Sequence, residues 1–344
     1  MFEGMKTDFP GARGYLNTAS MGLPPGSAVN ELRAAIDSWQ GGKANAPEYD
    51  RCVNEARALF AALVKTTPEC VAVGSQVSAM VGMVAAGLPS DSQVVCPEEE
   101  FTSVLFPFLA RSDLNVRLVP LEDLEASIRS DTDLVAFSLV QSADGHVSDG
   151  KAIARAAQRS GALTLVDATQ AAGWLPFDAN DFDVTVTGAY KWLASPRGTA
   201  FMTVRKESMD VPALIHPGWY AGESPWDSVY GPPLRLAENA RRFDLSPSWL
   251  SWVGTAAALK FIRTLGVENI HEHNVELANM FRSELGLSGS DSAIVALDLP
   301  STADEALLQS ISTSVRAGRL RVSFHFYNQP EDVELLVNAL APPS

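Results

Sequence analysis

The stretch from residue 164 to 205 constrains the fold more than any other part of this sequence, because it contains three short apolar runs in succession. The first run ends at Asp167, the second ends near Gly188, and the third spans residues 199–204. Short apolar runs bounded by Gly, Pro and polar residues predict buried strands. Lys191 follows the second run in a loop punctuated by Gly and Pro. Groups at the carboxyl ends of strands in an open α/β sheet converge in one crevice, so we expect Asp167 and Lys191 to face the same site.

A carboxylate at the end of one buried strand and a lysine just past the next are the two groups that pyridoxal 5'-phosphate requires of a protein. The lysine bonds to the cofactor as an aldimine, and the carboxylate keeps the pyridine nitrogen protonated so that the ring accepts electrons. We therefore predict Lys191 and Asp167 as catalytic residues and pyridoxal 5'-phosphate as the cofactor. Burial beside a cationic ring is expected to lower the pKa of Lys191. A structural aspartate that caps the next helix is the competing interpretation of Asp167.

Two segments carry a resemblance to a known family. V-D-A-T-Q-A-A-G at residues 166–173 and T-G-A-Y-K-W-L-A-S-P-R-G-T-A at residues 187–200 resemble the class V aminotransferase family, whose members include cysteine desulfurases, kynureninases and isopenicillin N epimerase. The resemblance extends from Tyr15 to Asn328. It implies the α/β fold of the fold-type I pyridoxal-phosphate enzymes. The expected parts are an N-terminal segment beside the active site (1–25), a large cofactor-binding domain with a mostly parallel central sheet flanked by helices (26–235), and a smaller α+β C-terminal domain (236–344).

Residues 70–88 predict a short strand, a small polar turn and a helix that begins near Val77. Such a turn presents free backbone N–H groups and the positive end of the helix dipole to a phosphate. We therefore predict that the cofactor phosphate lies on Gly74, Ser75, Gln76 and Val77. The family usually has a threonine in this turn, so the contact here is expected to depend more on backbone amides.

Two further turns follow predicted strands. The turn after residues 93–96 contains three glutamates, Glu98 to Glu100, which we interpret as a solvated surface. The resemblance places Phe101 over the cofactor ring, with core packing as the alternative. After the strand at residues 133–139, the resemblance puts Gln141 or Ser142 beside the cofactor or the substrate, and Gln141 is preferred.

The resemblance assigns three more cofactor contacts. Gln170 is expected to reach the ring oxygen of the cofactor, and Tyr190 to bind its phosphate. Residues 240–249 are similar to a family segment that crosses a dimer interface, so Ser246 is expected to reach the phosphate of the neighbouring site. These residues imply a homodimer with active sites near the interface. Arg197 is left without a role.

Substrate contacts are predicted at both ends of the chain. The loop at residues 15–26 is expected to approach the substrate through Asn17, Ala19 and Ser20, by resemblance to the family. Residues 319–328 predict a strand that contains Arg321. Because a guanidinium group binds a carboxylate in a bidentate manner, Arg321 is the candidate for the α-carboxylate of an amino acid substrate. His325 is expected on the same face of that strand.

The remaining pattern is largely helical. Apolar spacing predicts helices at 27–40, 50–64, 121–130, 151–160, 249–265 and 267–285. A strand is predicted at 115–120. Residues 216–233 form a long irregular segment with several aromatic residues, and we expect this segment to cover the active site or to contact a partner subunit.

Charge and hydropathy restrict the partners and the location. The 41 acidic and 26 basic residues give a formal charge of −15, which disfavours nucleic acid or an anionic membrane as a partner. No apolar run approaches the roughly 20 residues that span a bilayer. The first residues lack the apolar core of a signal peptide, so a cytoplasmic location is expected.

The reaction is inferred from the cysteines and from sequence variants. Cys52, Cys70 and Cys96 show no ligand-like spacing, so neither a metal site nor a disulfide framework is predicted. Desulfurases of the family use a cysteine in the C-terminal part, and all three cysteines here precede residue 100, so a persulfide-forming desulfurase is disfavoured. The variants E-F-T-S and R-F-D-L-S-P-S-W resemble a branch that includes C–S lyases.

A lyase acting on a sulfur-containing or otherwise β-substituted amino acid is therefore the preferred function. An aminotransferase, an epimerase and a kynureninase-like hydrolase stay open. A non-catalytic binding dimer is a further alternative. The presence of Asp167, Gln170, Lys191 and Arg321 together disfavours that alternative, because a decayed site has no chemical need of all four.

Overall fold

A central sheet of seven strands forms the body of the protein. The structure is a computed structural model that describes residues 2, 7–299 and 303–340. The strand order is β1-β7-β6-β5-β4-β2-β3. All neighbouring strands are parallel except β7, which runs antiparallel to β1 and β6. The strands are β1 (Val71–Gly74), β2 (Gln93–Pro97), β3 (Asn115–Val119), β4 (Leu134–Ser138), β5 (Leu163–Asp167), β6 (Val184–Gly188) and β7 (Ala200–Val204). The predicted α/β fold with a mostly parallel sheet is confirmed.

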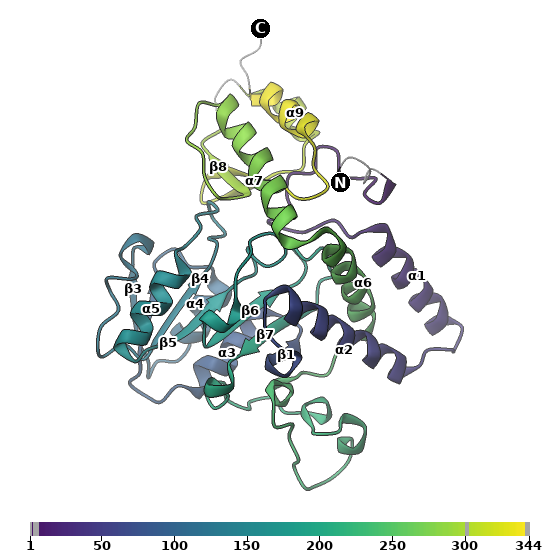
Figure 1. Ribbon diagram of the computed structural model, residues 1–344, viewed down its shortest axis with the longest axis vertical. Coiled ribbons are helices and arrows are strands. Elements are labelled where there is room, and N and C mark those ends of the chain that lie inside the picture. The colour runs from purple at the N-terminus through teal and green to yellow at the C-terminus, as the bar shows by residue number, and fades with distance from the viewer. Residues whose placement is uncertain (1, 3–6, 300–302, 341–344) are drawn as a thin grey trace.

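Helices cover both faces of this sheet, which explains why its inner strands are apolar throughout. Alternate strand residues point to opposite faces: Val166 packs with α2, α5 and α6, whereas Leu165 packs with α3 and α4. The helix α1 adds an outer layer against α6 (Figure 1). The helices are α1 (Gly26–Gln40), α2 (Ala46–Leu63), α3 (Val77–Gly87), α4 (Thr102–Leu109), α5 (Gly150–Ser160), α6 (Trp249–Leu265), α7 (Val267–Glu284), α8 (Glu305–Gln309) and α9 (Pro330–Leu340).

A second, smaller sheet lies near the C-terminus and has its own core. Its strand order is β8-β10-β9, all antiparallel, and its apolar residues pack against α7 and α9. The strands are β8 (Ile294–Leu297), β9 (Ser314–Arg316) and β10 (Arg319–Ser323). The N-terminal segment joins this region through bridges from Tyr15 to Ser312 and from Asn17 to Ser323 (Figure 1). The helix α6 packs on α1 and α2, so a domain boundary near residue 236 stays a prediction.

Two predicted elements are wrong. Residues 121–130 form only a 3-10 turn, Leu121–Asp123, followed by further turns. The Thr132 hydroxyl accepts a hydrogen bond from the Arg129 N–H, so a side chain replaces a helical backbone partner. The predicted strand 319–328 stops at Ser323, because Asn328 closes a turn by exchanging hydrogen bonds with the backbone of His325.

Other boundaries differ slightly. The helix α2 begins at Ala46 rather than Asp50, with Pro47 in the first turn, where its fixed φ is favourable. The long segment 216–233 contains two short 3-10 turns, Trp219–Ala221 and Pro225–Ser228, and the chain around it projects from the body at the bottom of Figure 1.

Candidate active site

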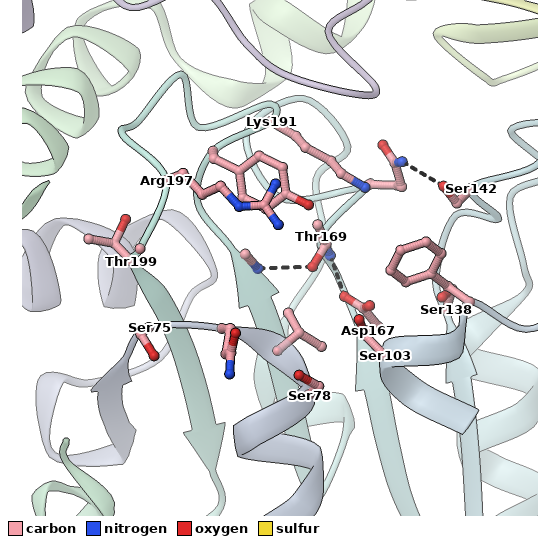
Figure 2. Close-up of a pocket in the computed structure, with 17 residues that line it drawn as sticks. Ser75, Ser78, Ser103, Ser138, Ser142, Asp167, Thr169, Lys191, Arg197 and Thr199 are labelled. Carbon is pink, nitrogen blue, oxygen red and sulfur yellow. Dashed lines mark hydrogen bonds between the residues drawn. The ribbon is translucent and has the colours of Figure 1, made fainter. Parts of the chain in front are cut away.

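A cavity of about 220 Å³ opens where β4, β5 and β6 end and α3 begins (Figure 2). This position is the crevice in which open α/β sheets bind ligands. Its walls are Ser75, Gln76, Val77, Ser78, Phe101, Ser103, Ser138, Ser142, Asp167, Thr169, Gln170, Gly188, Tyr190, Lys191, Arg197, Gly198 and Thr199. The structure therefore brings the predicted lysine and carboxylate into one cavity.

Asp167 is the last residue of β5 and is buried at the base of the cavity. The Thr169 N–H donates to Asp167 Oδ1 at 2.8 Å, and the Thr169 hydroxyl accepts from the Gly188 N–H at 2.9 Å. These bonds tie the ends of β5 and β6 together. Burial raises the pKa of Asp167 to about 6, although the hydrogen bonds from Thr169 and the charge of Lys191 act in the opposite direction. Asp167 Oδ2 accepts no hydrogen bond from any residue that the structure describes.

Lys191 enters the cavity from the loop after β6, and only 5% of its surface is exposed. Burial lowers the pKa of Lys191 to about 8, while the nearby Asp167 opposes this shift. Its Nζ lies 5.3 Å from the centroid of the Phe101 ring and 5.8 Å from that of the Tyr190 ring. A lysine whose pKa is lowered in this way is partly neutral near pH 7 and can act as a nucleophile or a base.

The N-terminal segment packs directly on the lysine loop. The Gly22 N–H donates to the Tyr190 carbonyl at 3.0 Å. A Cβ at Gly22 would lie 2.0 Å from the Lys191 carbonyl oxygen, so only glycine fits at this point.

His325 is a positioning residue that sequence reasoning did not identify. Burial lowers its pKa to about 3, so the ring is neutral. Its Nε2 lies 3.0 Å from the Trp192 carbonyl, to which it donates, and its Nδ1 lies 3.1 Å from the amide nitrogen of Asn274. The sequence predicts only that His325 shares a strand face with Arg321, whereas in the structure His325 lies beyond the end of β10. It connects the turn after β10 to the loop that carries Lys191.

The first turn of α3 provides one end of the cavity. Ser75, Gln76 and Val77 line the cavity as predicted, together with Ser78. The first N–H groups of a helix have no intrahelical partner, so they are available to an anion. Gly74 does not line the cavity. A Cβ at this position would lie 2.8 Å from Met80 Cε, so the glycine allows the Met80 side chain to pack closely against the backbone.

Arg197 and Tyr190 both line this cavity. Figure 2 shows Arg197 beside the loop that carries Lys191. The Arg197 guanidinium carbon is 4.8 Å from the centroid of the Tyr190 ring, within the range of a cation–π contact. This stacking holds a positive charge beside the Tyr190 hydroxyl. Burial raises the pKa of Tyr190, so the hydroxyl stays protonated and can donate a hydrogen bond.

Gln170 is held by three hydrogen bonds. Its amide nitrogen donates to the Ala19 carbonyl at 3.0 Å and to the Ser142 hydroxyl at 3.1 Å, and its amide oxygen accepts from the Trp192 indole at 2.7 Å. Ser142 therefore lines the cavity. The preferred residue, Gln141, does not line it, because its amide is turned to Glu100, with 3.1 Å between the amide nitrogen and Oε2.

Glu100 corrects the interpretation of the glutamate turn. Glu98 and Glu99 are exposed as expected, but Glu100 is only 4% exposed. Its carboxylate accepts hydrogen bonds from the backbone and hydroxyl of Ser138, from the Phe101 N–H and from the Gln141 amide. Glu100 thus fixes two residues of the cavity wall, Ser138 and Phe101. Phe101 is 41% exposed, so its ring is not a core residue.

The predicted substrate residues lie around the cavity. Ala19 is buried and contributes its carbonyl to Gln170, while its N–H donates to the Ser323 hydroxyl at 3.0 Å. The Asn17 side chain does not line the cavity, and its buried Oδ1 has no hydrogen-bond partner among the described residues. Ser246 is exposed and does not line the cavity of its own chain, so its role across an interface stays a prediction.

Arg321 lies in the centre of β10 and is 1% exposed. Its guanidinium donates to the Ser20 hydroxyl at 2.9 Å, to the Ser314 hydroxyl at 3.2 Å, and to both the carbonyl and the hydroxyl of Ser142. Because Ser142 lines the cavity, Arg321 lies directly behind its wall. The three serines come from three separate segments, so Arg321 joins the N-terminal loop, the loop after β4 and the small sheet.

The donor set fits pyridoxal 5'-phosphate. Asp167 has a free carboxylate oxygen for a ring nitrogen, Phe101 offers a flat face, and the first turn of α3 offers N–H groups to a phosphate. Lys191 provides a buried amine between them. The fold and this set of residues define a pyridoxal-phosphate enzyme of fold type I.

Comparison with known proteins gives the family. The family model described as aminotransferase class-V matches residues 41–296. The chain is 32% identical over 310 residues to a Bacillus subtilis (strain 168) protein named "Uncharacterized aminotransferase YcbU". The alignment covers 83% of this chain and 82% of that protein. It is 28% identical over 340 residues to isopenicillin N epimerase of Amycolatopsis lactamdurans, with 83% of each chain covered. This chain belongs to the class V aminotransferase family, and pyridoxal 5'-phosphate is its cofactor.

A solved structure supports the fold. The cystine C–S lyase C-DES, in complex with its reaction product cysteine persulfide, superimposes with a TM-score of 0.86 and 20% identity, covering 97% of this chain and 100% of that chain. At this identity the likeness shows the fold alone. Within residues 2, 7–299 and 303–340, no helix is both long and apolar enough to cross a bilayer.

Proposed function

We propose that this enzyme is a lyase that cleaves the bond between Cβ and a sulfur or other leaving group of an α-amino acid. In this reaction Lys191 Nζ accepts the α-proton, the Cβ–S bond breaks, and sulfur leaves with the bonding electron pair. Water then replaces the amino group, so the products are a thiol or persulfide, a keto acid and ammonia. The bound cofactor supplies the electron sink that stabilises the carbanion at Cα.

The geometry around Lys191 is the observation that carries the first step of the proposal, the removal of the α-proton. A buried amine with a pKa of about 8 can accept a proton near neutral pH. Asp167 Oδ2 is positioned to hold the ring nitrogen of the cofactor, and the charge of this carboxylate is what favours a protonated ring. Arg321 is positioned to orient the substrate through its α-carboxylate once Ser20 and Ser142 release its guanidinium.

The cysteines support a lyase rather than a persulfide-forming desulfurase. None of the three cysteines lines the cavity. Cys96 is buried in β2, and burial strongly raises the pKa of its thiol, so its thiolate is disfavoured. Burial also raises the pKa of Cys52. The sulfur product is therefore expected to leave as a free molecule.

An aminotransferase or an epimerase is the second candidate. The 32% identical relative is named an aminotransferase, and the 28% identical relative is an epimerase. Both reactions begin with the same proton transfer to a lysine, so the residues described above serve them equally. A binding dimer without catalysis is a weaker alternative, because Lys191 and Asp167 lie together in a cavity that fits the cofactor.

Product analysis separates these reactions. The cofactor-loaded protein is incubated with cystine, S-substituted cysteines and O-substituted serines without any added keto acid. A lyase releases keto acid and ammonia in equal amounts, and the variant Cys52→Ser, Cys70→Ser, Cys96→Ala keeps this turnover. Turnover that needs a keto acid acceptor would identify an aminotransferase, and inversion at Cα without product release would identify an epimerase.

We also infer a homodimer with active sites near the interface. The Leu245 N–H donates to the Val73 carbonyl at 3.0 Å, so the exposed Ser246 lies beside the strand that leads to the phosphate end of the cavity. In the projecting segment 216–233, Tyr230 is 90% exposed and Trp226 is 44% exposed. Large exposed aromatic side chains are typical of association surfaces. Sedimentation equilibrium is expected to give twice the chain mass, and a monomer would contradict the inference.

A further inference from the structure

Two arginines converge on one hydroxyl at the edge of the active site. Ser20 Oγ accepts from Arg321 Nη2 at 2.9 Å and from Arg316 Nη2 at 3.3 Å. Arg321 comes from β10 and Arg316 from the neighbouring strand β9. A neutral hydroxyl satisfies hydrogen bonds but does not offset charge. Two positive groups that share it therefore repel each other.

Neither of these arginines has an acidic partner among the residues that the structure describes. Throughout the described part of the chain, no Asp or Glu oxygen lies within 4.0 Å of the guanidinium of Arg316 or Arg321. By contrast, Arg319 on the same hairpin has Asp298 Oδ1 at 3.8 Å and donates to the Ala296 carbonyl at 2.7 Å. An unpaired cationic pair is unusual in a chain with a formal charge of −15, and it indicates a site for anions.

Both arginines lie close enough to the reacting centre to act on a substrate. Arg321 contacts Ser142, which lines the cavity. The positive charges of Arg321 and Arg316 add to the effect of burial in lowering the pKa of Lys191. Arg316 is exposed on the hairpin. Its Nη1 donates to the Val315 carbonyl at 2.7 Å and its Nη2 to the Ser20 hydroxyl, and both are neutral acceptors that an anionic ligand can replace.

The two positive charges determine how many negative groups a matching substrate carries. The α-carboxylate of an amino acid takes the two Nη groups of Arg321 and offsets one positive charge. The charge of Arg316 then remains without an acidic partner among the described residues. A second negative group on the substrate side chain offsets it.

We propose that Arg316 is a specificity-determining residue that binds a negatively charged side chain, so that the substrate is an amino acid with a second anionic group such as a carboxylate, sulfinate or sulfonate. This inference rests on the proposed function, because it takes the cavity as the place where an amino acid reacts. It adds the chemical class of the substrate to that function.

Matched pairs of amino acids test the proposal. The cofactor-loaded enzyme is titrated with L-glutamate and L-glutamine and with L-aspartate and L-asparagine, and binding is followed by the visible absorption of the cofactor. A charge-assisted hydrogen bond contributes about 1.5 kcal/mol or more, so each acid is expected to bind about tenfold more tightly than its amide. Arg316→Gln is expected to weaken the acids about tenfold and to leave the amides unchanged.

Arg319→Gln is the control, because it removes the same charge from the same hairpin but from an arginine that is already paired. This variant is expected to keep the preference for acids. Equal binding of acids and amides by the unaltered enzyme, or an equal loss in both arginine variants, would overturn the proposal. A preference for acids without keto acid release from β-substituted substrates would refute the lyase and leave the proposal standing. Keto acid release without any preference for acids over amides would support the lyase and overturn the proposal about Arg316.

Discussion

The buried ion pair between Arg57 and Asp244 allows the strongest stability prediction. Arg57 lies on α2, and its Nη2 is 2.7 Å from Asp244 Oδ2, with side-chain exposures of 4% and 0%. Asp244 Oδ1 also accepts from the Val73 N–H at 2.8 Å. The pair therefore ties α2 and β1 to the segment that carries Ser246. Asp244→Ala leaves a buried guanidinium without its carboxylate, with only the neutral Val71 carbonyl to accept from it, which costs about 3–5 kcal/mol of unfolding free energy.

Urea unfolding at saturating cofactor, followed by tryptophan fluorescence, measures this loss. The double variant Arg57→Met, Asp244→Leu removes both buried charges. The Val73 N–H then loses its acceptor, at about 1–3 kcal/mol, and the Val71 carbonyl and the partly exposed Arg241 each lose one partner, so this variant is expected to be less destabilised than Asp244→Ala. Asp113→Ala is the control, because Asp113 has the same 2.7 Å contact with Arg111 but is 42% exposed, and its loss should leave stability close to that of the unaltered protein. A loss of about 1 kcal/mol or less for Asp244→Ala would refute the reasoning, since exposed pairs cost that much.

Three further variants test the site. Asp167→Asn is expected to move the pKa of Lys191 below about 8, because the carboxylate raises it, and the pH dependence of cofactor capture measures this shift. Gly22→Ala is expected to weaken cofactor binding, since its Cβ would lie 2.0 Å from the Lys191 carbonyl oxygen; Gly11→Ala, with open space, is the control. Phe101→Ala is expected to raise the cofactor dissociation constant roughly two- to tenfold, as loss of one stacking contact predicts, and unchanged affinity would exclude stacking.

The sequence alone predicts the central sheet and the two reactive groups at its edge, Asp167 and Lys191. Runs such as Leu163–Asp167 are short, apolar and bounded by turn residues, so buried strands were the simplest interpretation, and the structure has them there. Once parallel strands are assumed, Asp167 and Lys191 must meet at the same edge. The helix at 249–265 was also predicted with the observed boundaries, because its apolar spacing is continuous.

Contacts between distant segments could not be read from the sequence. Glu100 is buried because Ser138 and Gln141, 38 and 41 residues away, donate to it, and no local pattern reports these donors. Gln141 and Ser142 are adjacent, yet only Ser142 lines the cavity. Which of the two does so depends on the turn in which the Gly145 N–H donates to the Gln141 carbonyl. His325 is similar, because its role appears only when the turn after β10 meets the loop after β6.

The covalent attachment of the cofactor to Lys191 is the central claim, and borohydride trapping tests it most directly. The cofactor-loaded protein is expected to show a visible absorption band that borohydride bleaches, and peptide mass analysis is expected to place the reduced cofactor on Lys191. Lys191→Ala should lack both the band and the label, whereas Lys260→Ala, at an exposed lysine paired with Glu55, should keep them. A label on another lysine, or a bleachable band in Lys191→Ala, would contradict the account.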